Sequence, residues 1–183
     1  MHNLHPDVER ILITEAQLAE RVREMGKEIT RDYEGEQIVM ISVLRGAAIF
    51  MADLVREIDL NVEMDYMAIS SYGGGTRSSG VVRILKDIDS DIKDRHVIIA
   101  EDILDSGLTL KYTMNLLASR NPQSIEVATL LHKQTPTPAH VDCKYTGFMV
   151  PDEFIVGYGL DYAERYRNLP YIGTLKESVY KHE

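Results

Sequence analysis

The stretch VIIAEDILDSGLTL, residues 97–110, decides how this chain folds. Its first four residues are apolar and mostly β-branched, which predicts a buried strand over residues 97–100. Two acids, Glu101 and Asp102, follow directly, and a third, Asp105, opens a turn of small residues that leads into a helix. In open α/β sheets, ligands bind at the carboxyl ends of the strands, where such turns lie. We therefore expect a ligand site at the end of this strand.

The turn itself, Ser106 to Thr109, predicts phosphate binding, because free backbone N–H groups at the start of a helix attract anions. Gly107 lets the backbone approach a ligand closely. The three acids cannot face a phosphate, so they serve another part of the ligand, a metal, or both. The alternative is a plain turn in which Asp105 or Ser106 caps the helix. A cap needs one such group, whereas three acids within five residues repel one another unless a ligand relieves them.

The composition predicts a single globular domain over residues 1–183, with 44% hydrophobic and 27% charged residues. The net charge of −9 argues against a protein that binds nucleic acid over much of its surface. One cysteine, Cys143, excludes an intrachain disulfide and fits a reducing compartment. The sequence shows no signal peptide and no apolar stretch of the roughly 20 residues that span a bilayer. We expect a cytoplasmic protein with neither a nucleic-acid nor a membrane partner.

Strand and helix patterns alternate through the middle of the chain, which predicts an α/β fold with a parallel sheet flanked by helices. A capping box at Thr14 and Gln17 predicts a helix up to about Tyr33. Further helices are expected over residues 47–58 and 109–119. The other strands are expected over residues 8–13, 38–44, 62–69, 81–85, 125–131, 145–150, 154–157 and 171–173.

The segment SSYGGGTRSSG, residues 70–80, has four glycines and four serines in eleven residues and cannot be core. It is either a floppy hairpin or a mobile lid over a site, touching the ligand through Ser71 and Tyr72. No histidine or cysteine pair has the spacing of a structural zinc site.

Three more positions lie where ligands are expected. Arg45-Gly46 ends the strand at 38–44 and is either a plain turn or an anion contact. Lys133 follows another strand and is either a surface lysine or a donor to a carbonyl oxygen. Asp161 and Arg167 belong to GYGLDYAERYR, residues 157–167, which predicts a tight loop. Arg167 can bind a phosphate or pair with an acid.

Together these motifs resemble the hypoxanthine-guanine (6-oxopurine) phosphoribosyltransferases of the type I phosphoribosyltransferase family. The motifs occur in the family's order: VLRG (43–46), SSYGGGT (70–76), EDILDSGLTL (101–110), LLHKQT (130–135) and PDEFIVGYGLDYAERYRNLP (151–170). The resemblance implies a central parallel sheet flanked by helices, with a small hood built from roughly residues 1–14 and 135–183. It also implies purine salvage: transfer of the 5-phosphoribosyl group from phosphoribosyl pyrophosphate to N9 of hypoxanthine or guanine, giving IMP or GMP and pyrophosphate.

For the phosphoribosyl donor, the resemblance implies three groups of contacts. Residues that bind the 5′-phosphate are Ser106, Gly107, Leu108 and Thr109. Residues that hold the ribose hydroxyls, partly through Mg²⁺, are Glu101 and Asp102. Residues that bind pyrophosphate are Leu44, Arg45, Gly46 and Arg167, with a non-proline cis peptide in that loop.

For the purine, the resemblance implies that Asp105 is the catalytic base that accepts the proton from N7. Lys133 donates to O6, Phe154 stacks on the ring, and backbone near Ile155 reads the purine edge. Asp161 lies beside the purine site and ligates a second Mg²⁺, while Ser71 and Tyr72 close over the site.

Two other classes remain open from the residues alone. One is a regulator with this fold that senses nucleotides and binds RNA, which the charge of −9 disfavours. The other is a receiver-like signalling domain, which does not account for the DSGLT turn or the lid. Nucleotide formation from hypoxanthine distinguishes these from the enzyme. The family also implies a homo-oligomer, a dimer or a tetramer.

Overall fold

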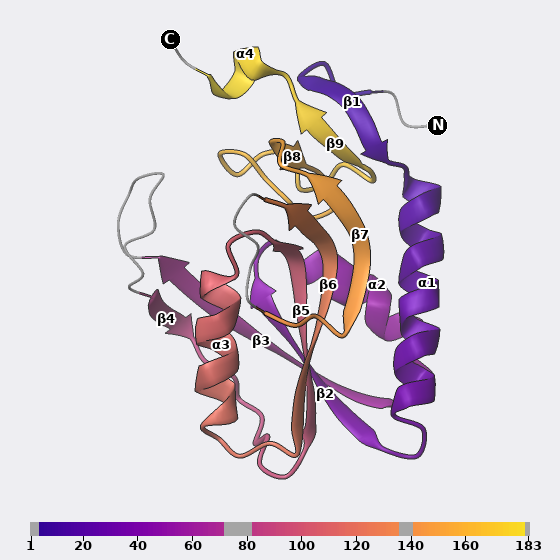
Figure 1. Cartoon of the computed structure of the whole chain (residues 1–183), viewed down its shortest axis with the longest axis vertical. Coiled ribbons are helices and arrows are strands. Elements are labelled where there is room, and N and C mark those ends of the chain that lie inside the picture. Colours follow the sequence, from indigo (N-terminus) through magenta and orange to yellow (C-terminus); the bar gives the residue numbers. More distant parts are fainter. Residues whose placement is uncertain (1–3, 72–81, 136–140, 182–183) are drawn as a thin grey trace.

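The computed structural model describes residues 4–71, 82–135 and 141–181 and arranges them as two sheets with helices (Figure 1). The large sheet has the strand order β4-β3-β2-β5-β6-β7. Neighbouring strands from β3 to β7 run parallel, and β4 is antiparallel to β3. Its strands are β2 (Gln37–Leu44), β3 (Asn61–Ser71), β4 (Val82–Lys86), β5 (His96–Leu104), β6 (Ser124–Gln134) and β7 (Tyr145–Pro151). The predicted α/β fold with a central, mostly parallel sheet is confirmed.

Helices cover both faces of this sheet, which explains the continuous apolar runs of its central strands. Along β2, Ile38 and Met40 pack with α1 (Glu15–Asp32) and α2 (Ala48–Arg56). The alternate residues, Val39 and Ile41, pack in a second core with α3 (Leu108–Ala118). Figure 1 shows α3 on one side of the sheet and α1 and α2 on the other.

The start of α1 follows the sequence prediction. The Thr14 side chain accepts a hydrogen bond from the backbone N–H of Gln17, and the Gln17 side chain accepts one from the Thr14 N–H. This capping box satisfies two of the amide groups that a helix start leaves without partners.

A three-stranded sheet, in the order β1-β9-β8, forms the hood. It joins β1 (Val8–Ile13) from the start of the chain to β8 (Ile155–Val156) and β9 (Ile172–Leu175) near its end, with the short helix α4 (Glu177–Tyr180) behind. Figure 1 shows the hood beyond the carboxyl ends of β6 and β7. Because β7 belongs to the large sheet, the hood's C-terminal strands begin at β8 and not near residue 135.

Two local expectations are wrong, and one short helix was not predicted. The strand expected to end at residue 100 continues to Leu104, because β5 keeps pairing with β6 beyond the acids. The helix behind it begins at Leu108 after Gly107, with φ of 71° and no side-chain cap, so neither Asp105 nor Ser106 is its N-cap. The helix α4 lay in a segment with no predicted structure. Among the described residues, no helix is long and apolar enough to cross a membrane.

Candidate active site

The acids of β5 lie on opposite faces of the sheet, because successive strand residues alternate. Ile98 and Ala100 pack toward α1 and α2, so Asp102, two residues on, faces the same side. There its Oδ2 fills the space where a side chain on Gly46 would begin, 1.7 Å from the ideal Cβ position. Glu101 faces the α3 side and lines a small pocket of about 110 Å³ with the turn that follows β5.

Both acids have raised pKa values. Burial raises the pKa of Glu101 well above its usual range, and the neighbouring charge of Asp102 adds to this. Burial likewise raises the pKa of Asp102 to about 6, although the Ile103 N–H and the charge of Arg167 oppose the shift. One Glu101 oxygen, Oε2, is buried and has no hydrogen-bond partner among the described residues. Such a carboxylate suits a ligand hydroxyl or a cation.

The turn after β5 carries the predicted phosphate contacts. Asp105, Ser106, Gly107 and Thr109 line the same pocket as Glu101, and Leu108 is exposed. The helix α3 starts there with no acid in its first turn, so its N-terminal amides suit an anion. The structure thus brings Glu101 and Asp105 together with the phosphate-binding turn, whereas Asp102 lies on the other face of the sheet, against Gly46.

The loop after β2 lies against Asp102 of β5, on the face of the sheet opposite to Glu101. Its Leu44–Arg45 peptide bond is cis, as the family resemblance implies. Gly46 touches Asp102 on one side. Gly159 touches Gly46 on the other, since an ideal Cβ on Gly159 would lie 2.1 Å from the Gly46 carbonyl oxygen. Only glycines allow this contact between loops more than a hundred residues apart in sequence.

Arg45, Asp161, Glu164 and Arg167 form a charged cluster on these two loops. Arg167 pairs with Asp161 at 3.0 Å and donates to the Gly159 carbonyl at 2.8 Å. Glu164 pairs with Arg45 at 2.6 Å and with Arg167 at 3.5 Å. The Arg167 Nε is buried without a partner among the described residues. The two arginines predicted to bind an anion are therefore neighbours.

Lys133, at the end of β6, lies between two carboxylates. Its Nζ is 3.0 Å from an oxygen of Asp152 and 3.8 Å from one of Asp105. Its side chain is only 15% exposed, whereas that of Asp105 is 57% exposed. This is a positioned lysine and not a surface one. The predicted purine donor and the predicted base thus lie side by side.

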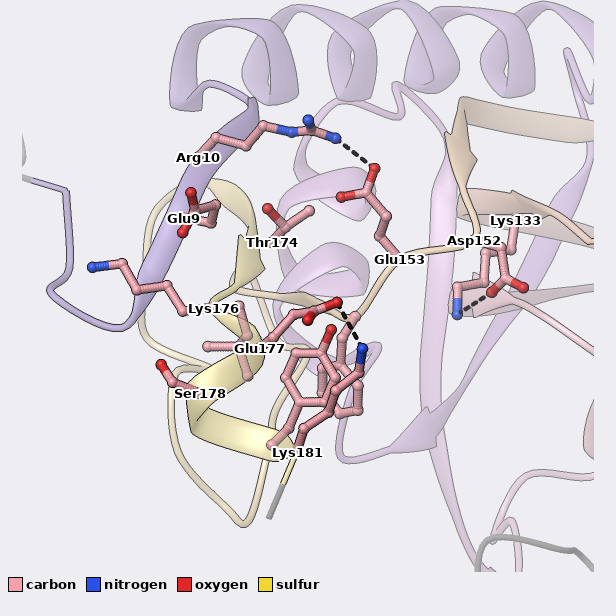
Figure 2. A pocket seen from close by; sticks show the side chains of 13 residues that line it. Glu9, Arg10, Lys133, Asp152, Glu153, Thr174, Lys176, Glu177, Ser178 and Lys181 are labelled. Atoms are coloured by element: carbon pink, nitrogen blue, oxygen red, sulfur yellow. Dashed lines mark hydrogen bonds and ion pairs between the residues drawn. The ribbon is translucent and has the colours of Figure 1, made fainter. Parts of the chain in front are cut away.

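A larger pocket of about 940 Å³ extends from Lys133 to the hood. Figure 2 shows Lys133 and Asp152 at one side of it, with Arg10, Glu153 and Glu177 farther away. Phe154 lines it, is 38% exposed, and stacks on Tyr180 with ring centroids 4.8 Å apart. Ile155 is buried on β8, the edge strand of the hood. An edge strand has backbone groups that face away from its neighbour, and these can bind a base.

The donor chemistry fits Mg²⁺, which prefers oxygen ligands. Glu101, Asp102 and Asp161 offer carboxylate oxygens, and Oε2 of Glu101 lacks a partner within the described ranges. Within those ranges, no three His, Cys, Asp or Glu side chains gather closely enough to hold a metal themselves. A bound Mg²⁺ would therefore take the rest of its ligands from substrate or water.

The structure does not test the predicted lid. Tyr72 lies outside the described residues, and Ser71 is the last residue of β3. Sequence reasoning missed four residues that the structure brings to the site: Asp152, Gly159, Glu164 and Tyr180. The first three of these residues lie in the quoted motif at residues 151–170, so the sequence did point to this segment. It did not indicate which side chains or loops these residues contact.

Comparison with known proteins agrees with this geometry. Residues 8–163 match the phosphoribosyl transferase domain family. A hypoxanthine-guanine phosphoribosyltransferase of Staphylococcus aureus is 49% identical over 97% of this chain and 99% of its own length. A bifunctional protein TilS/HprT of Listeria monocytogenes is also 49% identical, and the chain spans 28% of its length.

Among solved structures, a hypoxanthine phosphoribosyltransferase of Staphylococcus aureus superposes with a TM-score of 0.93. It is 48% identical, and the match covers 97% of both chains. The type I fold that the motifs implied is thereby confirmed, with the sheet, the hood and the loops at the strand ends in one arrangement. The chain belongs to the phosphoribosyltransferase family, within its hypoxanthine-guanine branch.

Proposed function

We propose that this protein is a purine-salvage enzyme, a transferase that moves the 5-phosphoribosyl group from phosphoribosyl pyrophosphate to N9 of a 6-oxopurine. The products are IMP or GMP and pyrophosphate. The observation that carries the proposal is the pair of Lys133 and Asp105, with Nζ and Oδ2 at 3.8 Å, at the strand ends next to Phe154. The names of the relatives support the same reaction.

The lysine–carboxylate pair matches one edge of a 6-oxopurine. O6 and N7 are neighbours on that edge, so an ammonium group can donate to O6 while a carboxylate accepts the N7 proton. A 6-aminopurine would place its N–H donors against the ammonium group of Lys133, and two donors leave each other unsatisfied. Phe154 supplies a ring face for stacking, and edge backbone near Ile155 supplies further hydrogen bonds.

The rest of the donor substrate follows from the neighbouring turn and loops. The 5′-phosphate binds the turn of Ser106, Gly107, Leu108 and Thr109 and the first amides of α3. Glu101 and Asp102 hold the ribose hydroxyls. The pyrophosphate binds Leu44, Arg45 and Gly46 on one loop and Arg167 on the other, where guanidinium groups match phosphate oxygens.

In the reaction, N9 forms a bond to C1′ of the ribose while the bond from C1′ to the pyrophosphate oxygen breaks. Positive charge builds on the ribose ring, and Asp105 accepts the proton that leaves N7. Arg45 and Arg167 stabilise the charge of the departing pyrophosphate. Glu101 and Asp102 would contribute to holding one Mg²⁺ and Asp161 a second, each completed by substrate oxygens and water, and the metal would supply further positive charge at the leaving oxygens. Ser71 and Tyr72, as the proposed lid, exclude water that would capture the ribosyl cation.

The test is nucleotide formation from phosphoribosyl pyrophosphate and Mg²⁺ with hypoxanthine, guanine, xanthine or adenine. We expect product from one or more 6-oxopurines and none from adenine. No product from any 6-oxopurine contradicts the proposal. Comparing kcat/KM for the three 6-oxopurines also defines the preferred base.

The role of Asp105 is tested by Asp105→Asn. We expect turnover to fall about 100-fold or more, with little change in the affinity for phosphoribosyl pyrophosphate. The control is Asp59→Asn, which removes the same charge at an exposed position. Equal losses of turnover and affinity would argue against a base.

We also propose a homo-oligomer, a dimer or a tetramer, in the cytoplasm. A groove of about 380 Å³ between α1, α2 and residues 168–170 offers a mixed charged and apolar surface to a neighbouring subunit. Light scattering during size-exclusion chromatography measures the oligomeric state, and a monomer at all concentrations contradicts this part.

A further inference from the structure

Glu164 holds an unusual position between the two arginines assigned to pyrophosphate. Its Oε2 lies 2.6 Å from a terminal nitrogen of Arg45 and 3.5 Å from one of Arg167. A single carboxylate oxygen thus bridges guanidinium groups from two loops. A phosphate oxygen would make the same contacts, since both are anionic acceptors.

The backbone fixes Glu164 in this place. Its N–H donates to Asp161 Oδ2 at 2.9 Å, and its φ of 63° is in the left-handed region that non-glycine residues rarely adopt. Ala163, just before it, has a φ of 49°. The loop therefore carries two consecutive left-handed residues that aim Glu164 at the arginines.

The ion pair between Arg45 and Glu164 is exposed to solvent, so another anion can replace the Glu164 carboxylate. The Arg45 side chain is 70% exposed and that of Glu164 is 62% exposed. An exposed ion pair of this kind contributes little to stability. A ligand with several negative charges competes with it easily, and the carboxylate has room to leave.

We propose that Glu164 is a specificity-determining residue: it serves as the resident counter-ion of the pyrophosphate subsite and is displaced when pyrophosphate binds. This inference rests on the proposed function, which assigns Arg45 and Arg167 to pyrophosphate. The carboxylate and a phosphate cannot both lie against these arginines without repulsion, because neither can donate a hydrogen bond.

The repulsion discriminates between substrate and product. Free pyrophosphate has one more ionisable oxygen than the esterified group in phosphoribosyl pyrophosphate, and so carries more charge near Glu164. The residue therefore weakens product binding more than substrate binding. Its effect is to promote release of pyrophosphate after the transfer.

The experiment measures binding of inorganic pyrophosphate with Mg²⁺ to the full chain by titration calorimetry. We expect Glu164→Gln to bind pyrophosphate about fivefold to tenfold more tightly than wild type, as removal of one nearby like charge predicts. Product inhibition by pyrophosphate should strengthen by the same factor, with a smaller change in KM for phosphoribosyl pyrophosphate. Glu164→Asp keeps the charge on a shorter side chain and should stay close to wild type.

The matched control is Glu63→Gln, which removes a carboxylate that pairs with Arg95 at 2.5 Å on another part of the sheet. It should leave pyrophosphate binding unchanged. If Glu164→Gln binds pyrophosphate equally or more weakly while wild type makes nucleotide, the inference fails and the proposed function stands. If wild type neither binds pyrophosphate nor makes nucleotide, both fail together.

Discussion

The contact between Gly159 and Gly46 predicts a large effect for one methyl group. In Gly159→Ala, the new Cβ would lie 2.1 Å from the Gly46 carbonyl oxygen, and the residue has a φ of 104°. The neighbouring atom is backbone and cannot turn aside, so one loop must move. Phosphoribosyl pyrophosphate contacts are proposed on both loops.

The loss of stability in Gly159→Ala has two causes, backbone strain and overpacking, and a control variant separates them. Gly35 has a φ of 81° with nothing within 4 Å of an added Cβ, so Gly35→Ala costs only backbone strain, about 1 kcal/mol. Gly159→Ala adds overpacking of about 1–3 kcal/mol. We expect the free energy of unfolding to fall by about 3 kcal/mol for Gly159→Ala and about 1 kcal/mol for Gly35→Ala.

Urea unfolding followed by circular dichroism measures both values. The slope of the free energy of unfolding against urea concentration should be the same in both variants and wild type. The KM for phosphoribosyl pyrophosphate should rise in Gly159→Ala and stay unchanged in Gly35→Ala. Equal stability losses in the two variants, with unchanged KM, would refute the close packing of the loops.

Three further predictions concern a buried acid, the hood, and a hydrogen bond that ties the loop at residues 157–167 to α2. Asp65 is buried and accepts hydrogen bonds from the N–H groups of Tyr66, Asp89 and Ser90. Burial raises the pKa of Asp65, but these bonds outweigh it and hold the pKa below 3.8. The folded protein thus binds its proton less readily than the unfolded chain, so this stabilisation is present above about pH 4 and is lost as the pH falls through the lowered pKa. Asp65→Asn should cost about 2 kcal/mol at pH 7 and much less in acid; an equal cost at both pH values contradicts this. Tyr180→Leu removes the ring stacked on Phe154 and should raise the KM for hypoxanthine about threefold to tenfold, with Tyr180→Phe near wild type; steady-state kinetics decides. Tyr158→Phe removes the hydrogen bond to Asp53, 2.5 Å long, and should lower stability by about 1 kcal/mol in urea unfolding, whereas an unchanged midpoint would show the bond contributes nothing.

The large sheet could be predicted because its signals are local. The apolar run of β2 has alternate residues in two cores, Ile38 and Met40 in one and Val39 and Ile41 in the other. A strand covered on both faces needs this pattern wherever it occurs. The capping box of Thr14 and Gln17 is equally local, since it needs only two side chains three residues apart.

The end of β5 could not be predicted in the same way. Apolar periodicity stops at Glu101, so the predicted strand stopped there too. Backbone pairing does not depend on side-chain polarity, and Glu101 and Ile103 continue in register with Thr129 and Leu131 of β6. This extension is what sends Glu101 and Asp102 to opposite faces of the sheet.

The charged cluster was out of reach because it depends on loop conformation. Arg45 and Glu164 are 119 residues apart in sequence. The loop that carries Glu164 has left-handed residues at Tyr158, Ala163, Glu164 and Tyr166. No periodic pattern specifies such a loop. The motif identified which residues belong to the site, but only the fold identifies their partners.

Unsatisfied polar groups gather where the ligand is proposed to bind. Among the described residues, buried side-chain atoms without a hydrogen-bond partner are Ser42 Oγ, Glu101 Oε2 and Arg167 Nε. Two of the three belong to proposed ligand-binding residues, and each such group destabilises the free protein by about 1–3 kcal/mol. When a ligand hydroxyl, cation or phosphate pairs with these groups, this destabilisation is removed, and its removal contributes to the free energy of binding. The strand end at residues 97–104 thus places Glu101 where one of its oxygens has no partner among the described residues, and Arg167 on the distant loop has an unpaired nitrogen in the same way.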